Sequence, residues 1–90
     1  MLMTGLKKLV LDVLIPFEVP KIDFTTRLSN IKGVEGVDVL IQEVERKVET
    51  AKITLEGENI NFDEVKDILE KTGTSLQSID RITCGKRIVS

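Results

Sequence analysis

The chain of 90 residues contains no histidine, tryptophan or tyrosine, and it has a single cysteine. Histidine is the commonest general base of enzymes and the commonest side-chain ligand of transition metals, so its absence disfavours an acid–base enzyme. One cysteine excludes a disulfide within the chain and a zinc site built from paired cysteines. The three phenylalanines lie outside the predicted strands and are a poor match to the aromatic sheet surface with which RNA-recognition domains stack bases.

An excess of positive charge and a long hydrophobic run are also missing. The net charge of −2 disfavours a nucleic-acid partner held by phosphate neutralisation. Lys7, Lys8 and Asp12 interrupt the apolar residues near the N-terminus, which leaves a run too short to span a membrane and without a small-residue cleavage site. We therefore expect a cytosolic protein without a membrane or nucleic-acid partner. The length predicts a single domain, residues 1–90, with a small core that oligomerisation would help to stabilise.

The first half of the chain predicts a strand, a helix and a hairpin. Residues 6–15 carry apolar side chains on both phases of a two-residue period, which indicates a central strand ended by Pro16. Residues 21–32 instead have apolar side chains at helical spacing. Alternation returns over residues 33–45 and again around residues 51–55, and the short charged turn between these two runs predicts a hairpin.

The second half predicts another helix and a last strand. A capping-box pattern at Asn61 indicates a helix that begins at Phe62 and ends at residues 72–73. Residues 74–89 have strand character, but their apolar residues do not keep one phase. This irregularity predicts a bulge or bend near residues 78–80.

The predicted order, strand–helix–strand–strand–helix–strand, is the split βαβ arrangement of ferredoxin-like α+β folds. Right-handed crossovers place both helices on one face of a four-stranded antiparallel sheet. The strands, numbered along the chain, are expected in the spatial order four, one, three, two. One face of the sheet is then covered by the helices, and the other face is open.

Asp12 is a carboxylate in the middle of the first apolar strand. The residues at odd positions of this strand form the row that faces the helices: Leu9, Leu11, Val13 and Ile15. Asp12 therefore points to the open face. The same face is expected to carry an apolar set that a second copy of the chain would cover: Val10, Leu14, Leu40 and Val44.

Three interpretations of this carboxylate are open. It forms an ion pair with Lys52 or Arg81 on a neighbouring strand. Alternatively, it combines with Asp80, and with Glu43 or Asp38, into a site of oxygen ligands for Ca²⁺ or Mg²⁺, within one chain or across an interface. The third interpretation is a polar contact that fixes the register of an oligomer.

Other reactive groups have simpler interpretations. Cys84 is expected to be a small buried strand residue, because no histidine is present to activate its thiol. The glutamates near the hairpin are expected to be a solvated acidic edge that discourages aggregation. Glycine-rich phosphate loops and nucleophile elbows are absent from the sequence.

The chain resembles the archaeal domain of unknown function 211 family in four runs, LVLDVLIP, GVEGVDVLIQEVE, KITLEGENINFDEVKDILEKTG and SIDRITCGKRIV. The resemblance covers residues from about 5 to 89. The resemblance implies a ferredoxin-like fold, ring-like or other higher homo-oligomers and divalent-cation binding, without an established activity. By this resemblance Asp12 and Asp80 match the acids of the first and last motifs. Phe17 and Gln77 stand where family members often have histidine, so only a cation held by oxygen ligands carries over.

We therefore expect a non-enzymatic, homo-oligomeric binding or regulatory module that assembles through its open sheet face and its terminal extension. The candidate metal-site residues are Asp12 and Asp80, with Ca²⁺ or Mg²⁺ as the cation. The alternative is a regulatory domain that senses a small molecule of amino-acid type, with the ligand at a subunit interface near Gly33–Gly36.

Overall fold

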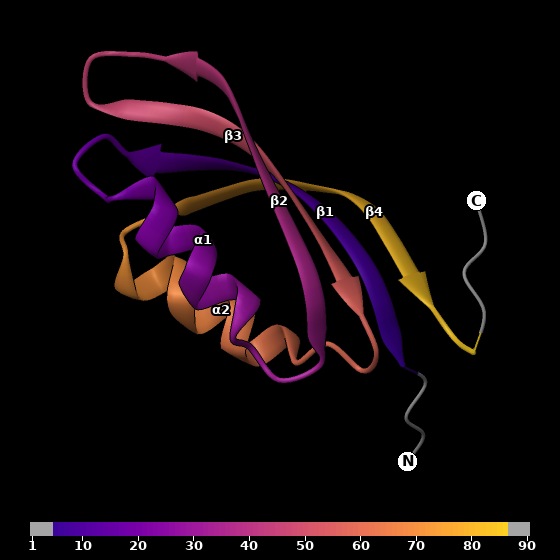
Figure 1. The fold of residues 1–90 in the computed structure, drawn as a ribbon. Coiled ribbons are helices and arrows are strands. Elements are labelled where there is room, and N and C mark those ends of the chain that lie inside the picture. Colours follow the sequence, from indigo (N-terminus) through magenta and orange to yellow (C-terminus); the bar gives the residue numbers. More distant parts are fainter. Residues whose placement is uncertain (1–4, 87–90) are drawn as a thin grey trace.

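The computed structural model describes residues 5–86, and these form one sheet with two helices (Figure 1). The elements follow the predicted order: β1 Leu6–Pro16, α1 Lys21–Ser29, β2 Val34–Val44, β3 Val48–Gly57, α2 Phe62–Lys71 and β4 Ser75–Cys84. The strands lie in the order β2-β3-β1-β4, and each neighbouring pair is antiparallel. The ferredoxin-like prediction is confirmed. Residues 87–90, which end both the predicted last strand and the short terminal extension expected to start at Gly85, lie outside the described residues.

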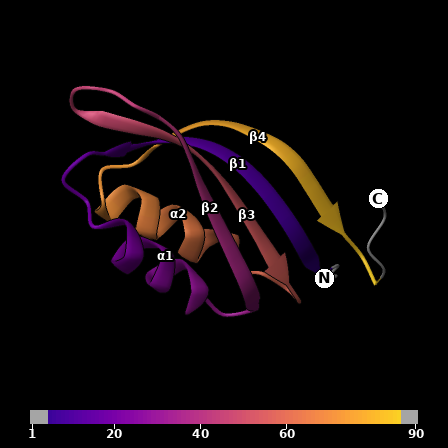
Figure 2. The ribbon, with the colours of Figure 1, turned by 45° about the horizontal axis from the view of Figure 1, so that its top comes forward.

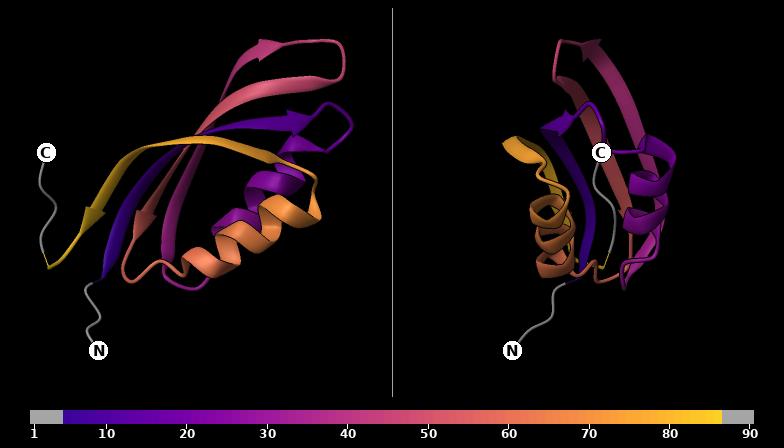
Figure 3. Two further views of the ribbon diagram at one scale, coloured as in Figure 1. Left: turned by 180° about the vertical axis from the view of Figure 1, so that it is seen from behind. Right: turned by 90° about the vertical axis from the view of Figure 1, so that its left-hand side faces the viewer.

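Both helices lie on one face of the curved sheet, and the other face is open (Figure 3). The central strand β1 determines the core, because the side chains of its helix-facing row, Leu9, Leu11, Val13 and Ile15, are no more than 3% exposed. They pack with apolar side chains of β3 and both helices, among them Phe24, Leu28, Ile53, Leu55, Val65 and Leu69. The helix-facing row of β1 predicted from the alternation is therefore confirmed. Neither helix among the described residues is long and apolar enough to cross a membrane.

The helix boundaries follow from local signals. The side chain of Asn61 accepts a hydrogen bond from the backbone N–H of Glu64, which caps α2 at its predicted start. The first helix is shorter than predicted, because it ends at Ser29 and the chain then turns through Gly33, whose φ is 90°. Ile31 nevertheless remains in the core, 4% exposed, although it lies outside the helix.

Two bulges in β4 explain why its apolar residues lose the two-residue period. The register with β1 shifts once between the partners of Val10 and Leu11 and again between those of Asp12 and Val13. Asp80 and Gln77 are the residues of β4 left without a partner at these shifts. Each bulge adds one residue, so the side chains that share the helix-side face are three positions apart, namely Leu76, Ile79 and Ile82. The bulge predicted near residues 78–80 is present, and the one at Gln77 was not predicted.

Three expectations about individual residues are wrong. Glu49, one of the glutamates near the hairpin, is 9% exposed and not solvated, and its carboxylate lies 2.6 Å from the Nζ atom of Lys21. Cys84 is exposed, not buried, because it ends an edge strand that extends beyond the helices (Figure 2). Val44 does not belong to the open face. It pairs with Glu49, which pairs with the buried Ile15, so all three side chains lie on the helix side of the sheet.

Gly57 and Gly36 provide a matched test of the packing between β2 and β3. A Cβ atom at Gly57 would collide with the carbonyl oxygen of Gly33 and lie 2.9 Å from the backbone nitrogen of Glu35, whereas a Cβ at Gly36 meets nothing within 4 Å. We expect Gly57→Ala to lower the free energy of unfolding by about 1–3 kcal/mol, because backbone atoms must move. Gly36→Ala should change it by no more than about 0.5 kcal/mol. Urea unfolding measures both, and equal values would contradict the close backbone approach.

Candidate functional site

The open face of the sheet places Asp12 between a cation and a hydroxyl group. Asp12 of β1 is opposite Lys52 of β3 on one side and opposite Ser78 of β4 on the other. Its neighbours Leu11 and Val13 are buried on the helix side, whereas the Asp12 side chain is 36% exposed. The prediction that Asp12 points to the open face is therefore confirmed.

Lys52 joins the two predicted metal-site residues. Its Nζ atom lies 3.2 Å from Oδ1 of Asp12 and 2.7 Å from Oδ2 of Asp80. The Ser78 hydroxyl oxygen lies 2.8 Å from Oδ1 of Asp80 and 3.3 Å from Oδ2 of Asp12, and its single proton serves one carboxylate at a time. The structure thus brings Asp12 and Asp80 together, and it places an ammonium group between them.

The bulge at Asp80 directs the side chain of this residue toward Lys52 on the open face. In a regular strand Asp80 and Arg81 would point to opposite faces. With the extra residue, Arg81 pairs with Val10 on the open face and Asp80 still reaches Lys52 on the same face. Arg81 was predicted as a partner of Asp12, but it forms no ion pair with any of residues 5–86.

These contacts perturb the ionisation of the cluster. The pKa of Asp80 is lowered, because the Lys52 ammonium and then the Ser78 hydroxyl donate hydrogen bonds to its charged form. The pKa of Lys52 is raised by the carboxylates of Asp80 and Asp12. Both charged forms are favoured, so the cluster is an ion-pair network at neutral pH.

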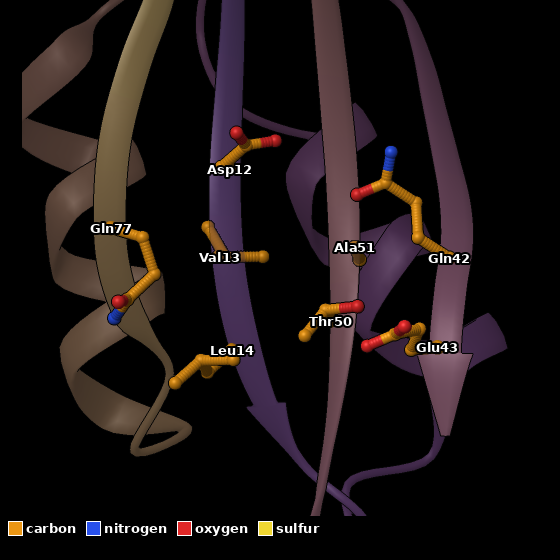
Figure 4. A pocket seen from close by; sticks show the side chains of 8 residues that line it. All are labelled: Asp12, Val13, Leu14, Gln42, Glu43, Thr50, Ala51 and Gln77. Carbon is orange, nitrogen blue, oxygen red and sulfur yellow. The ribbon is translucent and has the colours of Figure 1, made fainter. Parts of the chain in front are cut away.

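A shallow depression of about 560 Å³ lies beside Asp12 and extends across all four strands (Figure 4). Asp12 from β1 and Glu43 from β2 direct their carboxylates toward the intervening strand β3, where Thr50 adds a hydroxyl group (Figure 4). Gln42 and Gln77 supply amides. Glu43 was predicted near Asp12, whereas the glutamines and Thr50 were missed, since both glutamines are the extra residues of bulges.

The cluster has few of the ligands that a metal ion needs. Within residues 5–86, no three acidic, histidine or cysteine side chains are grouped so that they could hold a metal ion. Asp38, a predicted further ligand, pairs with Thr54 on β3 and does not line the depression. The Oδ1 atom of Asp12 is shielded from solvent and has no hydrogen bond, so the Lys52 ammonium contacts it as an ion pair.

The exposed apolar side chains of the sheet lie mainly on its two edge strands. On β4 they form the β4 apolar row, Leu76, Ile79 and Ile82, which are 37%, 42% and 61% exposed. On β2, Leu40 and Val44 are 55% and 63% exposed. Val10 and Leu14 on the central strand are half-buried. Val10, Leu14 and Leu40 lie on the open face as expected, because they pair with Thr54, Thr50 and Lys52 there. The rest of the open face is mostly polar, and the β4 apolar row and Val44 lie on the helix side.

Comparison with known proteins gives two findings. The family model described as "Uncharacterized ArCR", DUF211, matches residues 7–90. "Uncharacterized protein MJ0319" of Methanocaldococcus jannaschii is 39% identical over 88 residues, which is 97% of this chain and 90% of that protein. Neither description assigns an activity or a ligand.

The lowered pKa of Asp80 predicts a pH-dependent stability. A carboxylate with a depressed folded-state pKa stabilises the fold above its unfolded pKa of about 3.9, and this contribution is lost as the pH falls through the folded pKa. Asp80→Asn should therefore lower the melting temperature at pH 7 relative to the unmodified chain, and the difference should shrink below pH 4. Glu70→Gln is the control, because Glu70 is exposed on α2 and forms no ion pair with the described residues. A difference for Asp80→Asn that is unchanged at pH 2.5 would contradict the network.

Proposed function

The chain belongs to the domain of unknown function 211 family, and from this premise and its exposed sheet edges we propose that it is a non-enzymatic, cytosolic, homo-oligomeric binding module. The contacts between copies are made by the edge strands. The family supplies no activity, so the proposal rests on surface chemistry.

One observation carries the proposal, the position of the exposed apolar side chains. Strands β2 and β4 are long edges of 11 and 10 residues. A long apolar edge strand offers unpaired backbone groups to another chain and is a hazard unless it is covered. Assembly covers both the backbone groups and the apolar side chains, and it adds buried surface to a small core.

The mostly polar character of the open face favours the edge strands as the contact surface between copies. The charges at its centre are paired within the chain, since Lys52 contacts both Asp12 and Asp80 and the Nζ atom of Lys8 lies 3.1 Å from Glu56. We therefore propose contacts between copies through the edge strands, in place of the expected contacts through the sheet face.

The amino-acid-sensing alternative has less support. Gly33, at the start of its expected site, lies in close contact with the backbone of Glu58 and Asn59, and its carbonyl accepts a hydrogen bond from the N–H of Glu58 at 2.8 Å. This glycine serves a tight turn, and backbone atoms fill the space beside its Cα atom.

Sedimentation equilibrium tests the assembly. We expect a mass several times that of the 10.1 kDa chain, with dissociation in Ile82→Lys, because the ammonium would lie at the β4 edge. Phe17→Lys is the matched control, since Phe17 is 54% exposed in the loop after β1 and belongs to neither edge. A monomeric chain at millimolar concentration would contradict the proposal, and equal dissociation by both variants would contradict the assignment to the edges.

A divalent cation on Asp12 and Asp80 is the second candidate function. The supporting observation is that these carboxylates already converge on one positive charge, the Lys52 ammonium. A Ca²⁺ ion would have to displace that ammonium and take most of its remaining ligands from water, which predicts affinity in the millimolar range.

Calcium titration with melting curves tests this candidate. Ca²⁺ at tenfold excess over its dissociation constant stabilises the fold by about 1.4 kcal/mol and should raise the melting temperature by roughly 6–11 °C. The shift should be larger in Lys52→Met, where no ammonium competes, and absent in Asp12→Asn. If neither the unmodified chain nor Lys52→Met responds, Asp12 and Asp80 serve the ion-pair network alone.

A further inference from the structure

We infer that β4 of one copy pairs with β2 of the next copy, so that the sheet continues head to tail with Arg81 of one copy facing Asp38 of the other. This inference rests on the proposed assembly and adds which edges meet, in which direction and through which residues. It follows from strand direction, charge, register and apolar surface, in that order.

Strand direction permits an antiparallel contact between unlike edges. Because the order is β2-β3-β1-β4 and all neighbours are antiparallel, the two edge strands run in opposite directions. A second copy placed beside the first in the same orientation therefore presents its β2 antiparallel to β4. The antiparallel alternation continues across the contact, and the helices of both copies stay on the same face.

Charge selects unlike edges over like ones. Strand β2 carries Glu35, Asp38 and Glu43, all exposed and without an ion pair among residues 5–86. On β4, Asp80 already forms an ion pair with Lys52, which leaves Arg81 as the exposed charge without a partner in the described chain. Pairing β2 with β2 would oppose three acids to three acids, whereas β2 beside β4 joins opposite charges.

The register brings particular residues together. The observed pairs place Asp38, Thr54, Val10 and Arg81 in one row across the sheet, all on the open face. If the sheet of the next copy continues this row without a shift in register, Asp38 of that copy lies directly opposite Arg81. A guanidinium and a carboxylate opposite each other on one face of paired strands form a favourable cross-strand pair.

The apolar side chains match on the other face. In two other rows of paired residues across the sheet, Ile79 is level with Val39 and Leu76 is level with Ile41. All four side chains lie on the helix side. A shallow groove of about 320 Å³, lined mainly by apolar atoms, lies between α1 and β2, with Val39 and Ile41 at its base. Ile22 of α1 lines this groove and is 85% exposed. The β4 apolar row of the neighbouring copy would fill the groove and cover Ile22.

A contact between unlike edges leaves one free edge of each kind on every growing assembly. Such a heterologous contact produces a closed ring when the rotation between copies closes, and an open fibre when it does not. Contacts between two β4 edges or two β2 edges would instead stop at a dimer.

A charge exchange tests the inference in the full chain. Arg81→Glu and Asp38→Lys should each weaken association by at least about tenfold in sedimentation velocity, because each opposes like charges across the contact. The double variant Arg81→Glu/Asp38→Lys should regain association, since the pair is restored with its signs reversed. Arg46→Glu is the control, because Arg46 is an exposed arginine in the turn between β2 and β3. Circular dichroism checks that each variant is folded.

The outcomes separate the two proposals. Loss in both single variants with recovery in the double variant supports the unlike-edge contact. Association that is unchanged by either single variant, or that is not recovered in the double variant, overturns this contact and leaves the assembly itself standing. A monomeric unmodified chain overturns both. Ile22→Lys gives an independent measurement on the apolar face, and an assembly that it leaves unchanged contradicts the filling of the groove.

Discussion

The pairing of β4 with β1 through two bulges is the constraint on which the surface of this protein depends. Each bulge adds one residue, so apolar side chains at every third position of β4 share the helix-side face. The intervening polar residues turn to the open face, where Asp80 reaches Lys52. Without the bulges, the regular alternation of a strand would place Asp80 and Arg81 on opposite faces. The candidate site and the β4 apolar row are thus two consequences of one feature of the pairing.

The centre of the open face and its two edge strands differ in how their charges are compensated. On the open face the ion pairs are internal to the chain, with Lys52 shared by two carboxylates from β1 and β4. On the same face, at the two edge strands, Asp38 and Arg81 have no such partner among the described residues. Exposed ion pairs contribute little to stability by themselves, but unpaired charges of opposite sign at opposite edges specify orientation between copies.

Ferredoxin-like folds host many unrelated functions, so the fold alone does not assign one here. The relevant chemistry lies in side chains that the fold brings together from distant parts of the chain. Lys52 and Asp80 are 28 residues apart, and Ser78 and Asp12 are 66 apart. An edge strand with exposed apolar residues is tolerated when a specific partner covers it, and charge at the same edge limits which partner can do so.

The sequence by itself determined the element order, the central place of β1 and the row of β1 that faces the core, because these depend on periodicities within each segment. It also placed Asp12 on the open face and anticipated one of the bulges in β4. Only the tertiary structure decided that Cys84 is exposed, that Val44 lies on the helix side, and that Lys52 stands between Asp12 and Asp80. The reason is physical. The direction of a side chain on a bulged strand, and its exposure at an edge, depend on the register with a strand about 70 residues away and on how far the helices extend, and neither is encoded in a local pattern.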